Sequence, residues 1–479
     1  MVVLPVLFLG LRKDPDEPPI FPGGWPVLGH AHFFFGNTLN FWKVIKTLSE
    51  KSMEMGHATH FFMGPVKFYV LTDPDDINKV SNVCFQKDNF SYKFTKDLLG
   101  DGLLFSHVPT WKKHRKLINP AFNQQILDNF MGIFNSQSKL LVTRLKVEVD
   151  KGPFDHSTYV RQNFMETICL TAIDNAVSEE DAIKYVQSFE AYLNLNISRF
   201  IKFWLHSDFI FKFSNIKKQL DENSKFLTEM SDSVLKKKRA LRNNGIQKIN
   251  NETVPKIKVF MDLMMDLDGE VLTDQEIKDE INTIIMAGHD TSANVTIFAL
   301  LLIGSYPEVQ ERIYKELQEV LGDKDDVEKQ DLSRLVYLEA VLKETMRYYV
   351  MAPFVGRFID REVKLRNCTL KPGYNCLFMM YGIHRNPLWG PDVNEFKPER
   401  WLDPATMPKN PNMFVGFSTG KRNCIGKTYA MMSIKVLLSH LLRRYKLHGD
   451  HTKMVLKLDV LLKPVTGHLI TLEDRLRKK

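Results

Sequence analysis

The stretch Phe417-Ser418-Thr419-Gly420-Lys421-Arg422-Asn423-Cys424-Ile425-Gly426 is followed at once by a helical pattern that runs from about Lys427 to Tyr445. Cys424 is therefore expected at the N-terminus of a helix. There the helix dipole and the free backbone N–H groups favour a thiolate over a thiol, and Arg422 adds positive charge two residues earlier. A thiolate held in this way is a metal ligand or a nucleophile.

The neighbours of the cysteine support a functional interpretation. Gly420 and Gly426 let the backbone approach something flat and close, and Phe417 can cover one side of the sulfur. A cysteine taken without its context is usually a small, buried and inert side chain. The ten surrounding residues reverse that expectation for Cys424.

The composition is that of a folded globular protein, because 44% of the 479 residues are hydrophobic and 25% are charged. Lysine and arginine (65) exceed aspartate and glutamate (57) by eight, an excess too diluted by acids to indicate a nucleic-acid partner. Five cysteines without a Cys-x-x-Cys pair do not resemble a disulfide framework or a structural zinc site. A reducing compartment fits this set best.

The order of patterns indicates one mostly helical domain with a small β portion. From about residue 111 to 345 the pattern is helical nearly throughout, with polar breaks at 150–153 and at the basic stretch 236–251, which we expect to be a surface loop. A β-hairpin is expected at 60–80, where the pattern is broken by Gly-Pro and Asp-Pro, and further short strands are expected at 363–380. We find no linker long enough to divide the chain.

A long central helix begins at a capping box, Thr273 followed by Glu276, and its pattern runs to Gly304. Halfway along it lies Ala287-Gly288-His289-Asp290-Thr291-Ser292, where a purely structural core helix would carry leucine or isoleucine. Burying Asp290 costs several kcal/mol unless partners are supplied. The middle of this helix is therefore a second candidate functional segment.

The N-terminal segment 1–13 is apolar up to Leu11 and ends in Arg12-Lys13, and a proline-rich hinge is expected at 14–30. Eleven apolar residues are too few to span a bilayer core, which needs about twenty. The segment is a shortened signal anchor, an interfacial segment or a loose terminus, and it lacks the arginine-rich character of a mitochondrial transit peptide. We expect the catalytic domain to occupy 31–479 and to face water.

The pattern Phe-x-x-Gly-x-Arg-x-Cys-x-Gly resembles the cytochrome P450 superfamily of haem-thiolate monooxygenases. Four further segments match the motifs of this family in its order: Trp111 with Arg115, Ala287 to Ser292, Glu344-Thr345-Met346-Arg347, and Phe396-Lys397-Pro398-Glu399-Arg400. The resemblance spans residues 22 to 470. It implies a mainly α fold with haem between the long central helix and the helix that carries the cysteine.

The resemblance also implies a role for each motif. Cys424 would be the axial thiolate of haem b, surrounded by Phe417, Gly420 and Gly426. Trp111, Arg115 and Arg422 resemble the donors to the anionic haem propionates, for which an indole N–H or a guanidinium is suited. Glu344, Arg347 and Arg400 would form a buried ionic triad with a structural role.

In the central helix, the resemblance makes Ala287 and Gly288 the wall over the haem, with Asp290 and Thr291 relaying protons to bound dioxygen. The alternative for Thr291 is a helical threonine that only bonds back to its own helix. His289 is left without a role.

The wording of several motifs is most similar to the microsomal clan that contains the fatty-acid ω-hydroxylases, in the form common in insects. Many vertebrate members have glutamate where this chain has Ala287, and that carboxylate esterifies a haem methyl. Covalent attachment of haem is therefore not expected. The substrate would be a lipophilic small molecule: a fatty acid, a terpenoid, a pheromone or hormone, or a xenobiotic.

The resemblance implies that electrons come from NADPH through NADPH-cytochrome P450 reductase, with cytochrome b5 as an occasional second donor. A basic face would steer an acidic donor, although a solvated face is the plainer alternative. This face comprises Lys112, Lys113, Lys116, Lys421 and Lys427.

The aromatic stretch 200–213 could dip into a membrane surface or simply be core. We expect an enzyme of the endoplasmic reticulum membrane whose catalytic domain faces the cytosol. Two other functions stay open: a haem-thiolate isomerase or dehydratase that needs no reductase, and a non-enzymatic haem-based ligand binder or sensor.

Overall fold

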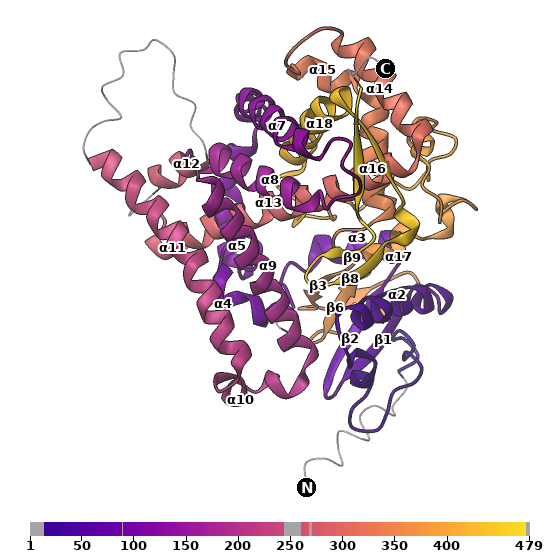
Figure 1. The fold of residues 1–479 in the computed structure, drawn as a ribbon. Helices are drawn as coiled ribbons and strands as arrows, with labels where there is room; N and C mark the ends of the chain where they lie inside the picture. Colours follow the sequence, from indigo (N-terminus) through magenta and orange to yellow (C-terminus); the bar gives the residue numbers. More distant parts are fainter. Residues whose placement is uncertain (1–13, 89, 244–259, 268–270, 476–479) are drawn as a thin grey trace.

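The computed structural model describes residues 14–88, 90–243, 260–267 and 271–475. Helices make up most of the chain and the strands form a small β portion, which confirms the predicted fold class (Figure 1). The helices are α2 (Thr38–Glu54), α3 (Pro74–Val83), α4 (Lys96–Leu99), α5 (Val108–Ile118), α6 (Gln124–Asp128), α7 (Met131–Leu145), α8 (Ser157–Ala172), α9 (Glu179–Ile201), α10 (Asp208–Lys212), α11 (Asn215–Asn243), α12 (Phe260–Asp266), α13 (Asp274–Ser305), α14 (Pro307–Leu321), α15 (Lys329–Arg334), α16 (Val336–Tyr348), α17 (Met380–His384) and α18 (Lys427–Arg444).

The main sheet has four strands in the order β1-β2-β6-β3. The pair β1–β2 is the antiparallel hairpin expected from the sequence, β6 joins β2 in parallel, and β3 adds antiparallel to β6. The other strands form three two-stranded pairs. The strands are β1 (Ala58–Met63), β2 (Val66–Leu71), β3 (Val355–Phe358), β4 (Val363–Lys364), β5 (Thr369–Leu370), β6 (Asn375–Phe378), β7 (Tyr445–Gly449), β8 (Val455–Leu458), β9 (Leu462–Thr466) and β10 (Ile470–Asp474).

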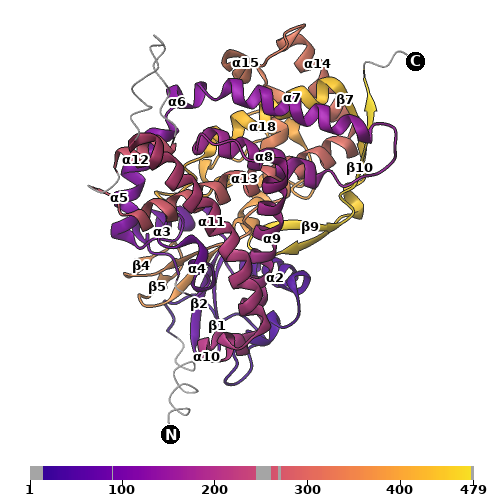
Figure 2. The ribbon, with the colours of Figure 1, turned by 60° about the vertical axis from the view of Figure 1, so that its left-hand side comes forward.

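Helix α13 crosses the middle of the molecule and packs most closely on α8 (Figures 1 and 2). Its start is the predicted capping box, in which Thr273 accepts from the Glu276 N–H and Glu276 accepts from the Thr273 N–H. By length and composition α13 could cross a membrane, yet 78% of its apolar window is buried inside the protein. It is therefore the core helix of the domain, as predicted.

The predicted loop at 236–251 is wrong in its first half. Residues 236–243 continue α11, and 244–251 lie outside the described residues. Lysine and arginine are good helix formers, and Lys238 of this stretch is buried against Asp174 and Asp262, at 2.9 and 3.3 Å. Those ion pairs hold the basic end of α11 on the body.

The N-terminal segment 1–13 lies outside the described residues. The proline-rich segment 14–30 is tied to the main sheet. Phe21 is buried and its N–H donates to the carbonyl of His60, while Glu17 pairs with the buried Lys67 at 2.6 Å. The segment 14–30 therefore lies at the end of the molecule that contains β1 and β2 (Figure 1).

Candidate active site

The cysteine loop closes on itself just before α18. The Cys424 N–H donates to the carbonyl of Phe417 at 3.0 Å, and the turn between them places Ser418 and Gly420 at φ of +62° and +73°. Gly426 is the N-cap of α18, so Cys424 stands two residues before the N-cap, at the helix N-terminus as predicted. The local sequence thus fixes the position of the sulfur at a helix N-terminus.

Protonation of the thiol differs from the expectation. Cys424 has accessible surface, yet burial is the largest influence on its pKa and raises it, against the N–H of Gly426 and the charges of Arg115 and Lys427. Arg422 is not among the groups that lower this pKa. The helix end alone therefore does not produce a thiolate, and a bound metal ion would have to displace the proton.

Two glycines have a packing reason that the sequence did not indicate. A Cβ on Gly420 would lie 2.3 Å from the Ser81 hydroxyl, and one on Gly288 would lie 2.5 Å from Ile168 of α8. Gly420 therefore lets the loop pack on α3, and Gly288 lets α13 pack on α8. A Cβ on Gly426 would meet neighbours only at ordinary distances, near 4.0 Å, so the protein itself does not require glycine there.

Two buried cations, Lys87 and Arg357, and the partly buried Arg422 converge beside the cysteine loop. Arg422 donates to the carbonyl of Ser106 at 2.7 Å, but its Nε and Nη1 are buried without a hydrogen-bond partner. The Nε of Arg357 in β3 is likewise buried and unpartnered. Burial, then Arg357 and Arg422 nearby, hold the pKa of Lys87 well below its ordinary value.

This cation trio (Lys87, Arg357 and Arg422) fits the two carboxylates of a haem. Unpartnered, buried guanidinium N–H groups are costly, and carboxylates are the partners that they bind best. Asp88, the buried acid of this region, accepts from the Ser91 N–H at 2.6 Å through Oδ1, and its Oδ2 is buried without a hydrogen-bond partner. Sequence reasoning found Arg422 but missed Arg357 and Lys87. For these two residues the one available signal was an arginine inside an apolar strand.

The other two predicted propionate donors lie on α5. Trp111 is buried, and the Arg422 guanidinium lies over its ring at 4.7 Å, so the structure brings these two residues together. Arg115 instead donates to the carbonyl and the side-chain oxygen of Asn423, at 3.0 and 3.2 Å. The described hydrogen bonds of Arg115 therefore hold the cysteine loop.

In the middle of α13, Asp290 is buried in an ion cluster. Its carboxylate accepts from Arg161 of α8 and lies 3.3 Å from Lys463 of β9. Burial raises the pKa of Asp290, but Lys463 and Arg161 outweigh it and bring the pKa to about 2. Asp290 is thus an ionised carboxylate at neutral pH, and both of its partners were missed from the sequence.

Three other residues of this segment interrupt the buried surface of α13. Ala287, Gly288 and Thr291 are partly accessible within a helix that is otherwise largely buried. The hydroxyl of Thr291 donates to the carbonyl of Ala287 at 2.6 Å. His289 is a buried ring that packs edge-on against Tyr185 and Phe189, so its role in the structure is core packing.

Glu344, Arg347 and Arg400 meet in one fully buried cluster. Arg347 binds both oxygens of Glu344, at 2.8 and 2.7 Å, and the Nε of Arg400 reaches the same carboxylate at 3.0 Å. The backbone N–H of Lys397 and the indole of Trp401 complete the shell around this carboxylate. The grouping inferred from sequence therefore exists as a single contact network.

A mainly helical fold, a cysteine at a helix N-terminus and a nearby cation trio fit the class of haem-thiolate proteins. The family model for cytochrome P450 matches residues 18–471, and the chain belongs to this family. It is 29% identical over 472 residues to cytochrome P450 4V2 of Mus musculus, covering 95% of this chain and 90% of the relative.

Two Drosophila melanogaster proteins are also similar. Cytochrome P450 4d2 is 32% identical over 84% of each chain, and cytochrome P450 4c3 is 30% identical over 86% of this chain and 81% of its own. These relatives confirm the predicted family and its insect branch. The protein is a haem-thiolate monooxygenase that acts on lipophilic small molecules with electrons from a redox partner, and its haem iron is bound by a cysteine thiolate.

Proposed function

We propose that this chain inserts one atom of dioxygen into a fatty-chain or terpenoid substrate, with Cys424 as the iron ligand. The observation that carries the assignment of the site is the cation trio beside the cysteine loop, since its unpartnered donors suit the carboxylates of haem. When bound, the haem supplies the oxidising chemistry that a thiolate ligand favours. The relatives carry the family-4 designation, which supports a fatty-acid substrate class.

Other residues of the site hold the cofactor and support the cysteine loop in this proposal. Trp111 and Arg422 orient the propionates together with Arg357 and Lys87, and Arg115 holds the loop that positions the sulfur. The triad around Glu344 keeps the structure behind the cofactor rigid. Phe417, whose carbonyl closes the cysteine loop, belongs to the same support.

Asp290 and Thr291 are proposed to move protons. The Thr291 hydroxyl holds its proton toward the carbonyl of Ala287, and it can rotate to donate elsewhere. Asp290, ionised between Lys463 and Arg161, passes a proton only when one of these cations moves away. An isomerase or dehydratase would not need this pair, so its presence disfavours that alternative.

The electron donor is proposed to be NADPH-cytochrome P450 reductase, with cytochrome b5 as a second donor. Lys112 of α5 and Lys421 of the cysteine loop both lie over the ring of Phe85, at 5.9 and 5.4 Å. This brings the two basic segments side by side. Exposed lysines at the edge of a haem site suit an acidic flavoprotein surface.

A membrane-facing surface is proposed at the turn between α9 and α11. Phe203, Trp204, Phe209 and Phe213 are 51–75% exposed, and Phe35 stacks on Phe203 at 5.5 Å. Exposed aromatic clusters of this kind mark an interaction with lipid or protein.

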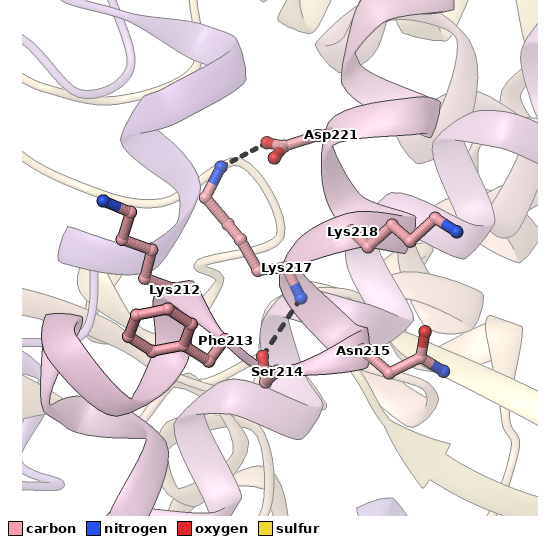
Figure 3. A pocket seen from close by; sticks show the side chains of 7 residues that line it. All are labelled: Lys212, Phe213, Ser214, Asn215, Lys217, Lys218 and Asp221. Carbon is pink, nitrogen blue, oxygen red and sulfur yellow. Dashed lines mark hydrogen bonds and ion pairs between the residues drawn. The ribbon is translucent and has the colours of Figure 1, made fainter.

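Lysines border this aromatic cluster. The close view shows Lys212, Lys217 and Lys218 around an open pocket of about 530 Å³ that also includes Phe213 (Figure 3). Ammonium groups beside exposed rings suit the headgroups of a bilayer. We therefore propose that residues 31–479 form a catalytic domain on the cytosolic face of the endoplasmic reticulum membrane, with 1–13 as its anchor and 14–30 as the proline-rich hinge between the two.

The test is turnover in a reconstituted system. The protein is combined with NADPH-cytochrome P450 reductase in phospholipid vesicles and given lauric acid, and products are identified by mass spectrometry under ¹⁸O₂. We expect an NADPH-dependent product that contains one ¹⁸O atom. Product formed without NADPH would support the isomerase reading, and haem binding without any oxidised product from a panel of fatty acids, terpenoids and insecticides would support a ligand binder.

A further inference from the structure

His114 ties α5 to α13 through both of its ring nitrogens. The ring is 1% exposed, its Nδ1 lies 2.6 Å from Glu280 Oε1, and its Nε2 lies 3.2 Å from Glu276 Oε1. The two carboxylates are four residues apart on α13, so one imidazole spans a full turn of that helix. On α5 the ring comes three residues after Trp111 and directly before Arg115.

The proton count of this contact is unusual. Ionised carboxylates only accept hydrogen bonds, so two contacts of this kind require a proton on each ring nitrogen. Burial alone would lower the pKa of His114, but Glu280 and then Glu276 outweigh burial and raise it. Burial also raises the pKa of Glu280, whereas the His114 ring beside it lowers that pKa, as expected for a carboxylate that binds a protonated ring.

The charges that face the ring come from three elements. Helix α13 contributes Glu276, Asp279 and Glu280, α5 contributes Lys113, which lies 3.2 Å from Glu276, and the preceding loop contributes Asp101. Asp279 is engaged by the Asp101 N–H at 2.9 Å. The second oxygen of Glu280 is buried without a hydrogen-bond partner, so a neutral ring would leave this carboxylate poorly compensated.

The other side of α5 faces the cofactor residues. Arg115 donates to Asn423 of the cysteine loop, and Trp111 carries the Arg422 guanidinium on its ring. Helix α5 is therefore held between α13 and the cysteine loop. We propose that His114 is a positioning residue, whose doubly protonated ring locks α5 on α13 and so sets Trp111 and Arg115 against the haem; this inference rests on the proposed haem site.

The test measures how fast haem leaves the holoenzyme. Transfer to excess apomyoglobin is followed by absorbance between pH 6 and 9. A raised folded pKa gives a contribution that is complete below the ordinary imidazole value of 6.5 and is lost as the pH rises through the raised value. In the wild type, haem loss should therefore accelerate as the pH rises.

The variants distinguish loss of the His114 contact from a general loss of structure. We expect H114Q to lose haem about tenfold faster at pH 6, the size of one lost charge-assisted hydrogen bond, with a flattened pH profile. E280Q keeps an oxygen acceptor but removes the charge, so its acceleration should begin at lower pH. The control H448Q removes an exposed histidine of β7 that lies 3.5 Å from Glu473, and it should keep the wild-type rate and profile.

Each outcome decides the proposal. Wild-type rate and pH slope in H114Q, or an unmoved profile in E280Q, would overturn it while leaving the haem site intact. If H114Q does not fold, the wild-type and E280Q profiles still decide. A wild type that binds no haem through thiolate, seen as a missing carbonyl difference band, would remove the proposed function together with this inference.

Discussion

Replacement of Glu344 by glutamine should destabilise the protein far more than any exposed acid would. The carboxylate is fully buried and receives donors from Arg347, Arg400, the Lys397 backbone and Trp401. Glutamine turns one acceptor oxygen into a donor and removes the negative charge. Asp392 still pairs with Arg400 at 3.1 Å.

The magnitude follows from what is left unpaired. Within the described residues, Glu344 is the one carboxylate that pairs with Arg347, whose other acceptors are the backbone carbonyls of residues 384, 393 and 395. Breaking a buried ion pair in this way costs about 3–5 kcal/mol. The nearby control E399Q breaks a pair with Arg312 in which both side chains are 44–49% exposed. The Tyr337 hydroxyl also donates to Glu399 at 2.8 Å, and the amide oxygen of glutamine can still accept this bond, so the change should cost below about 1 kcal/mol.

Urea unfolding of the purified holoenzymes, followed by circular dichroism and by the haem absorbance, measures both changes. We expect a clearly lower midpoint for E344Q, with loss of haem over the same urea range, and a nearly unchanged midpoint for E399Q. An E344Q midpoint equal to that of E399Q would refute the argument, because the buried charge would then carry no energetic weight.

Three further predictions concern the site itself. Cys424→Ala should abolish the thiolate-type band of the carbonyl difference spectrum, and a retained band would discredit the ligand assignment. Thr291→Ala should keep haem but divert electrons to hydrogen peroxide, so an unchanged product yield per NADPH would count against the relay. Lys463→Met removes one of the two cations that bring the pKa of Asp290 to about 2 against burial. Because a depressed carboxyl pKa stabilises the fold above the ordinary value of 3.8 and this contribution is lost as the pH falls, the variant should unfold at higher pH in an acid titration followed by circular dichroism; an unmoved midpoint would contradict this.

Local patterns carried most of what the sequence predicted correctly. The capping box at Thr273 and the start of α18 after Gly426 depend on neighbours within a few residues, so the sequence shows them directly. Glu344 and Arg347 share a helix face at a spacing of three residues, which makes their pairing readable.

The parts that escaped prediction are set by tertiary packing. Lys87 and Arg357 lie 270 residues apart in the sequence and meet only because β3 and the segment after α3 fold beside the cysteine loop. His114 likewise finds its carboxylates 162 and 166 residues away. Sequence periodicity does not reveal contacts between residues so far apart in the chain. The contact of Gly420 with Ser81 depends on tertiary packing in the same way.

The crowding of Lys87, Arg357 and Arg422 has a consequence for biosynthesis. Like charges that repel one another in a buried place weaken the apoprotein, and a ligand that binds only the native state restores the lost stability by mass action. A newly made chain would therefore compete with quality-control proteases until porphyrin arrives. The supply of iron porphyrin in the cell, as much as transcription, should set how much of this protein accumulates.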